Sequence, residues 1–108
     1  MSPDYLGEFE HMVLLSIMRL GADAYGLAIR EELESVAGRS PSSGSLYTTL
    51  DRMERKGLLE SYAGDASNER GGRARRYVRV TPAGRALLAR SRGALMALWE
   101  GLEGALDR

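Results

Sequence analysis

The sequence predicts a mainly α-helical fold that carries a small β-hairpin. Three segments between residues 6 and 56 repeat apolar side chains at steps of three and four residues, which is the period of a helix face. Beyond Gly57 the pattern changes to the alternation that is typical of strands, and a last segment returns to the helical period. Three helices followed by a hairpin is the order of a winged helix-turn-helix.

The first two helices are predicted on either side of a short turn. The first covers residues 6–20, where apolar residues occupy almost the whole circumference, so we expect it to be packed from more than one side. Gly21 stands where a helix stop is expected. The second helix is predicted to begin at Asp23, a good N-cap, and to end at Gly38.

The third helix is predicted over residues 43–56. Leu46, Leu50 and Met53 form its buried stripe, and Gly57 ends it. The short connection to the second helix is rich in Ser, Pro and Gly and indicates a tight turn. The second and third helices therefore form a helix-turn-helix pair.

The polar side of this third helix is the first candidate binding site. A major groove about 12 Å wide accepts one helix, whose N-terminal side chains reach base edges. Its hydroxyls are suited to phosphates or base edges, and its basic residues add positive charge. The candidate DNA-binding residues are Ser43, Ser45, Tyr47, Thr48, Thr49, Arg52 and Lys56. The alternative is an ordinary amphipathic helix with a solvated polar side, but the hairpin that follows directly favours DNA recognition.

The hairpin is the second candidate binding site. Residues 58–63 and 75–80 are predicted as its strands, and the Gly-rich segment 64–74 as a long tip. Five arginines without an intervening acid lie within ten residues, and the candidate DNA contacts among them are Arg70, Arg73, Arg75 and Arg76. Arginines on such a tip are suited to phosphates or to a narrow minor groove. The alternative is a solvated loop, although an uncompensated arginine cluster repels itself.

The net charge of zero conceals a basic middle section. Residues 1–38 hold seven acids and two bases, residues 39–92 hold twelve bases and five acids, and residues 93–108 hold one base and three acids. Segregation of charge along a chain is typical of a protein that presents a basic face to a polyanion. The middle section, with its net charge of +7, contains both candidate DNA-binding segments.

A long last helix is predicted over residues 81–106, with Thr81 as its N-cap and Pro82 at its first position. At 1.5 Å per residue it would be about 35 Å long, too long for a core of this size to cover its apolar stripe. Because an exposed apolar stripe implies a partner, we expect a homodimer through this helix. The residues expected at this dimer or ligand interface are Leu95, Met96, Trp99 and Leu102.

Two interpretations of Trp99, the only tryptophan, stay open. It is expected as an anchor of the dimer interface, or as one wall of a pocket where a flat apolar or cationic small molecule stacks. In domain terms, residues 1–80 are predicted as a DNA-binding domain and residues 81–108 as a dimerisation helix, which together form one structural unit.

Composition excludes several classes of site. Without Cys the chain has neither disulfides, thiolate catalysis nor a Cys-rich zinc site. His11 is the only histidine, so neither a His-based metal cluster nor a Ser–His–Asp triad is expected. We therefore expect no enzyme activity, no cofactor and no metal. Without an apolar run of about 18 residues or a signal segment, we expect a cytoplasmic protein that has no membrane partner.

Four linked motifs resemble the PadR-type (phenolic acid decarboxylase regulator) family of transcriptional regulators. They are Gly7-Glu8-Phe9-Glu10 with Val13-Leu14-Leu15, Tyr25-Gly26 with Ile29, Ser43-Gly44-Ser45-Leu46-Tyr47 through to Gly57-Leu58, and Arg70-Gly71-Gly72-Arg73 through to Arg76-Tyr77, Thr81 and Gly84. In this order they are similar to the family's opening helix, second helix, recognition helix and wing. The likeness covers about residues 6–90, and Thr48 stands where many members have Pro.

The resemblance implies a dimer formed through the first and last helices and, in most members, repression of transcription. The single short C-terminal helix is similar to the compact subfamily. We therefore expect a sequence-specific DNA-binding transcriptional regulator, a homodimeric repressor of double-stranded DNA sites that a small-molecule effector releases. The alternative is a winged helix that binds protein instead of specific DNA through its acidic second helix.

Overall fold

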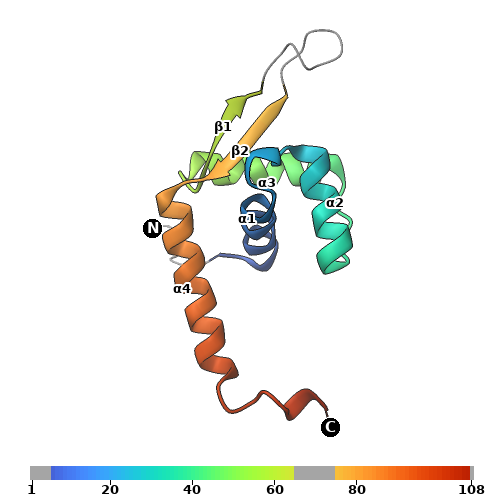
Figure 1. Ribbon diagram of the computed structural model, residues 1–108. Coiled ribbons are helices and arrows are strands. Elements are labelled where there is room, and N and C mark those ends of the chain that lie inside the picture. The colour runs from blue at the N-terminus through green and yellow to red at the C-terminus, as the bar shows by residue number, and fades with distance from the viewer. Residues whose placement is uncertain (1–5, 65–74, 108) are drawn as a thin grey trace.

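The computed structural model of the protein describes residues 6–64 and 75–107. Its helices and strands follow the chain in the predicted order (Figure 1). They are α1 Glu8–Leu20, α2 Gly26–Ala37, α3 Ser43–Arg55, β1 Leu59–Ala63, β2 Arg76–Val80 and α4 Pro82–Trp99, with one-turn 3-10 helices η1 Gly21–Asp23 and η4 Ala105–Asp107. The prediction of a mainly α fold with a small hairpin is confirmed.

The core lies around α1, which contacts α2, β2 and α4 (Figure 1). Its largest buried side chains are Val13, Leu14 and Ile17 from α1, Ile29 and Leu33 from α2, Leu46, Leu50 and Met53 from α3, and Leu59 and Val78 from the hairpin. The four α-helices and both strands all contribute to this single cluster, although the distal part of α4 does not, and the cluster fixes α3 and the hairpin relative to each other.

The strands β1 and β2 pair antiparallel, with Leu59 opposite Val80 and Ala63 opposite Arg76. We call this hairpin the wing. Its base is also tied to the start of α2, since the Val78 N–H donates to the Ala24 carbonyl oxygen over 3.0 Å. The residues between the strands, 65–74, lie outside the described part of the chain.

The predicted start of α2 at Asp23 is wrong. Asp23 ends the 3-10 turn η1, and α2 begins at Gly26 after Tyr25, whose side chain makes no capping hydrogen bond. Tyr25 instead forms an isolated β-bridge with Tyr77. Because the backbone at residues 24–25 pairs with β2, it stays extended where a local capping signal predicts a helix.

The turn between α2 and α3 is held by Arg30. Its Nε donates to the Pro41 carbonyl oxygen over 3.1 Å, and its Nη1 donates to Ser43 Oγ over 2.9 Å. The Ser42 hydroxyl caps α3 by accepting from the Ser45 N–H. The predicted bounds of α3 therefore agree with the structure to within one residue.

The predicted end of α4 near Leu106 is wrong. The helix ends at Trp99, so its 18 residues span about 27 Å. Gly101 adopts φ +85°, a left-handed conformation that a helix cannot continue through, and Leu102 then lies beyond the turn. Buried residues occur only in the first ten positions of α4, and the last of them is Ser91.

Candidate nucleic-acid interface

Six of the α3 residues predicted to contact DNA are exposed, namely Ser43, Ser45, Tyr47, Thr48, Arg52 and Lys56. Thr49 is not, because it is only 4% exposed. It follows Leu46 by three residues and precedes Met53 by four, which places it in the buried stripe of the helix. The expected DNA contact of Thr49 is therefore corrected, since its side chain belongs to the core.

Tyr47 lies across the junction of α2 and α3. Its side chain is 43% exposed, and its hydroxyl packs against Gly26, the first residue of α2. A side chain at position 26 would occupy the space of the tyrosine ring. The glycine therefore lets Tyr47 lie along the surface, where its hydroxyl sits beside the N-terminus of α2.

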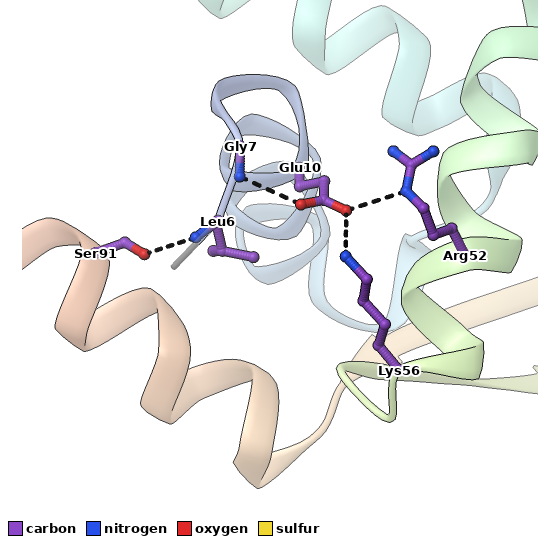
Figure 2. Close-up of polar contacts among 6 residues, drawn as sticks. All are labelled: Leu6, Gly7, Glu10, Arg52, Lys56 and Ser91. Carbon is purple, nitrogen blue, oxygen red and sulfur yellow. Dashed lines mark hydrogen bonds and ion pairs between the residues drawn. The ribbon is translucent and has the colours of Figure 1, made fainter. Parts of the chain in front are cut away.

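One flank of α3 is tied to α1 through Glu10. Glu10 Oε2 accepts from Arg52 Nε over 3.2 Å and from Lys56 Nζ over 3.3 Å, and Oε1 accepts from the Gly7 N–H over 3.2 Å (Figure 2). Burial raises the pKa of this carboxyl, but the hydrogen bonds from Gly7, Arg52 and Lys56 outweigh it, so the pKa lies below its ordinary value. Glu10 is ionised at neutral pH.

The other flank of α3 is tied to the wing through Arg76. The Arg76 guanidinium contacts the carboxylates of Asp51 over 2.9 Å and Glu54 over 2.8 Å, and its Nε donates to Ser61 Oγ over 2.9 Å. The hydrogen bond from Ser61, together with Arg76, holds the pKa of Glu54 below its ordinary value. Arg76, expected as a DNA contact, thus joins β2 to α3.

Arg55 is an α3 cation that does not belong to the predicted DNA contacts. It is exposed and, among the residues the structure describes, has no ion-pair partner. At 100° per residue it projects between the two paired flanks, close to the direction of Thr48. The helical period of the sequence already places Arg55 on the polar side, opposite the buried stripe.

Three tyrosine rings in a row, with an arginine over the ring at each end, cover the base of the wing. The Arg75 guanidinium lies 4.3 Å from the Tyr25 ring centroid, and Arg79 lies 4.7 Å from that of Tyr62. Tyr77 stands between the two tyrosines, edge-on to Tyr25 at 5.6 Å and stacked on Tyr62 at 5.7 Å. These ring contacts are favourable, and those of Tyr25 hold the wing against the start of α2. Arg70 and Arg73, the other predicted wing contacts, lie outside the described residues.

The residues predicted at the dimer or ligand interface are exposed on the distal half of α4 and just beyond it. The exposed fractions are 53% for Leu95, 53% for Met96, 42% for Trp99 and 50% for Leu102. Beyond Gly101 the chain turns, so that Leu102 and Leu106 line an apolar groove of about 230 Å³ together with Trp99. An apolar surface of this kind is typical of a partner site.

A larger cavity of about 590 Å³ lies between the first turn of α1 and the middle of α4. Its lining is mostly apolar and includes the polar side chains of Glu8, His11 and Ser91.

Among the described residues no group of three His, Cys, Asp or Glu side chains is arranged to hold a metal ion. No helix of the described part is both long and apolar enough to span a bilayer.

The model of the transcriptional regulator PadR-like family matches residues 14–90 of this chain. The chain belongs to the PadR-like family. The resemblance seen in the sequence motifs is thereby confirmed, and with it the winged helix-turn-helix fold of a DNA-binding regulator. The family and the named relatives of this PadR-like protein are transcriptional regulators rather than enzymes.

Two relatives and one further structure illustrate the similarity. Transcriptional regulator Rv3488 of Mycobacterium tuberculosis is 44% identical over 88 residues, which cover 80% of this chain and 78% of that protein. The crystal structure of a PadR family transcriptional regulator from Eggerthella lenta is 27% identical, covers 93% of this chain and 87% of its own, and has a TM-score of 0.66. A putative transcriptional regulator from Thermoplasma acidophilum, 21% identical over 94% of this chain and 98% of its own, shares the fold with a TM-score of 0.69.

Proposed function

We propose that this PadR-like protein is a homodimeric, sequence-specific DNA-binding repressor that a small-molecule effector releases. The observation that carries the DNA-binding part is the outer face of α3. There Thr48 and Arg55 are exposed between two flanks whose charged side chains already form ion pairs within the protein. A helix with a protruding polar ridge, braced on both sides, is suited to a major groove.

The proposed contacts divide by their position on the fold. Ser45, Tyr47 and Thr48 lie in the first half of α3 and are assigned to base edges and nearby phosphates. Arg52, Arg55 and Lys56 lie in its last turns and are assigned to phosphates. Arg70 and Arg73, together with Arg75, are assigned to the backbone or minor groove beside the wing. Ser43 and Arg76 are assigned to holding α3, given their bonds to Arg30, Asp51 and Glu54.

The proposed dimer uses the exposed apolar surface that follows Ser91 on α4. In this arrangement residues 1–80 form the DNA-binding domain and residues 81–108 the dimerisation segment of one structural unit. Burying Leu95, Trp99 and Leu102 against a second copy removes apolar surface that is otherwise exposed to water. Two copies would then present their α3 helices to half-sites roughly 34 Å apart.

The proposed effector site is the cavity between α1 and α4. Its volume of about 590 Å³ is in the range of small-molecule pockets, and Leu95 connects it to the apolar end of α4. A molecule held there would favour one spacing of the two α3 helices over another and so shift the population away from the DNA-binding form. Trp99 is proposed as a dimer anchor, and the alternative is that it stacks on the effector.

The test is DNA binding measured by fluorescence anisotropy at physiological salt and across a salt series. The duplexes are the DNA upstream of the protein's own gene and a random sequence of equal length. We expect tighter binding to the upstream DNA. Thr48→Ala should lower this preference, and Arg55→Ala should weaken binding to both duplexes and reduce the salt slope by about 1 per subunit. Arg90→Ala, which removes an exposed arginine from α4, is the matched control and should bind as the wild type does.

Equal binding to both duplexes would contradict the proposal and favour the protein-binding alternative. A specific observation keeps that alternative in view, since α2 is acidic and carries Leu27 at 54% exposure. Unchanged binding of the Thr48 and Arg55 variants would leave a DNA-binding protein but remove α3 as its contact.

A further inference from the structure

Glu10 is a carboxylate in an unusual place. Its residue is 9% exposed, whereas the side chains of the two cations that it contacts, Arg52 and Lys56, are 45% and 37% exposed. The two partners lie 42 and 46 residues further along the chain, Arg52 on α3 and Lys56 at its C-cap. A single buried oxygen therefore holds two cations that reach toward the surface from the helix proposed to contact DNA.

Capping of α1 accounts for one oxygen of this carboxylate, since Oε1 accepts from the N-cap Gly7 N–H, but it does not account for the two cations held by Oε2. Removing a carboxylate from water is costly, and a buried ion pair often contributes no more to folding than a well-packed apolar side chain would. The neighbouring core of α1 is built from apolar residues such as Val13 and Leu14. A charged side chain beside them is best explained by what it does to the groups that it contacts.

The contact with Arg52 uses only one edge of the guanidinium. Glu10 accepts from Nε, and the two terminal nitrogens of Arg52 turn away from Glu10 in Figure 2. These nitrogens make no hydrogen bond with any residue that the structure describes. The pair of N–H groups that suits a phosphate is thus left on the outer side.

The position of Glu10 is itself fixed from two sides. Its Oε1 accepts from the Gly7 N–H, and the preceding Leu6 N–H donates to the buried Ser91 Oγ of α4 over 3.2 Å (Figure 2). Polar contacts therefore run from α4 through the start of α1 to α3. The first turn of α1 cannot shift relative to α4 without breaking a bond to a buried group.

We infer that Glu10 is a positioning residue for DNA binding, which aims Arg52 and Lys56 and offsets one of their two charges. This inference rests on the proposed function. With Glu10 in place, α3 presents an oriented guanidinium and a net single charge on this flank. Without it, two unrestrained cations would bind any phosphate backbone, and the discrimination between specific and random DNA would fall.

The experiment compares the wild type with Glu10→Gln, which keeps the shape and removes the charge. Binding to the upstream and random duplexes is measured across a salt series. We expect Glu10→Gln to bind random DNA more tightly, to steepen the salt slope by about 1 per subunit and to lower the specificity ratio about fivefold or more. The control is Glu32→Gln, which removes the same charge from α2, where Glu32 pairs with Arg19 of α1. It should leave the affinity for random DNA, the salt slope and the specificity ratio unchanged.

A second comparison, in a variant that lacks both cations, separates the positioning of Arg52 and Lys56 from a general effect of Glu10 on folding. In the double variant Arg52→Gln with Lys56→Gln, adding Glu10→Gln should change neither the slope nor the specificity ratio. A structural role alone would lower the melting temperature in both backgrounds and leave the slope of Glu10→Gln at the wild-type value, which would overturn the inference. If the wild type does not prefer the upstream duplex, the proposed function fails instead.

A measurement on the unaltered protein covers the case in which Glu10→Gln does not fold. The Arg52 Nε–H resonance should exchange slowly with water in nuclear magnetic resonance spectra, because the proton is bound to Glu10. The exposed Arg55 provides the comparison within the same helix. Equal exchange rates at the two arginines would contradict the positioning role.

Discussion

The hydroxyl of Tyr47 on α3 packs against Gly26, the first residue of α2, where a side chain would overlap the tyrosine. This contact joins the two helices of the helix-turn-helix at the surface proposed to meet DNA. The obstacle to a side chain at position 26 is the end of a tyrosine that is 43% exposed, so the tyrosine can move away. A substitution there is therefore expected to disturb binding more than folding.

Gly26→Ala should lower affinity for the upstream DNA about tenfold, while the free energy of unfolding falls by no more than about 1 kcal/mol. The reason is that the new methyl group displaces the Tyr47 ring. Anisotropy and thermal unfolding measure the two effects. Tyr47→Phe removes the overlapping oxygen but leaves Cζ 2.9 Å from the added methyl group, so it should recover part of the lost stability of Gly26→Ala. A decrease in unfolding free energy as large as the decrease in binding free energy would contradict this expectation.

Gly84→Ala should unfold the protein more easily, by about 1–3 kcal/mol. Here the added methyl group would overlap the backbone carbonyl oxygen of Leu58 and lie 2.7 Å from Val80 Cγ1, and neither can move far. Urea denaturation measures the change. Gly44→Ala, in the open first turn of α3, is the control and should stabilise by about 0.4–1 kcal/mol. Equal midpoints for the two variants would contradict the packing at Gly84.

Acid should destabilise the protein below pH 4.5, in part through Glu10 and Glu54. Both carboxyls have a pKa below the ordinary value of 4.5 in the folded state. Their contribution is therefore complete above that pH and is lost as the pH falls through the lowered folded values. Glu54→Gln should flatten the decline of unfolding free energy with falling pH. Glu31→Gln, at an exposed position on α2, is the control and should retain the wild-type slope.

Trp99→Ala should weaken the proposed dimer about thirtyfold or more, since a buried tryptophan is a frequent hot spot. Sedimentation equilibrium over a range of protein concentrations measures the change. Leu27→Ala removes a similarly exposed apolar side chain from α2 and should leave the dimer intact. A tight dimer in the Trp99 variant would assign the interface to another surface.

Local signals allowed the sequence to predict α3 and the wing. Ser42 caps the helix, and Gly57 adopts φ +78° just beyond it, as the stop signal indicates. The start of α2 could not be predicted in the same way, because it depends on a β-bridge between Tyr25 and Tyr77. The end of α4 depended on which of several glycines takes a left-handed conformation, and residue type alone does not decide this.

The candidate site was predicted in outline but not in its electrostatics. Thr49 was grouped with the other hydroxyls by residue type, although its position in the helical period places it in the core. The partners of Arg52 and Arg76 are brought to α3 by the tertiary fold, from α1 and from the wing. The net charge of a sequence segment treats these arginines as free cations. Their ion pairs become visible only in the folded structure.

The pairing on both flanks of α3 bears on how such a regulator would search a chromosome. Non-specific attraction to DNA grows with the number of cations that are free to replace counterions. Because Glu10 offsets one of the two charges of Arg52 and Lys56, and Asp51 with Glu54 engage Arg76, fewer cations of this surface contribute to that attraction than the sequence suggests. Each visit to random DNA would then be brief, and a long residence would need the base contacts of a matching site.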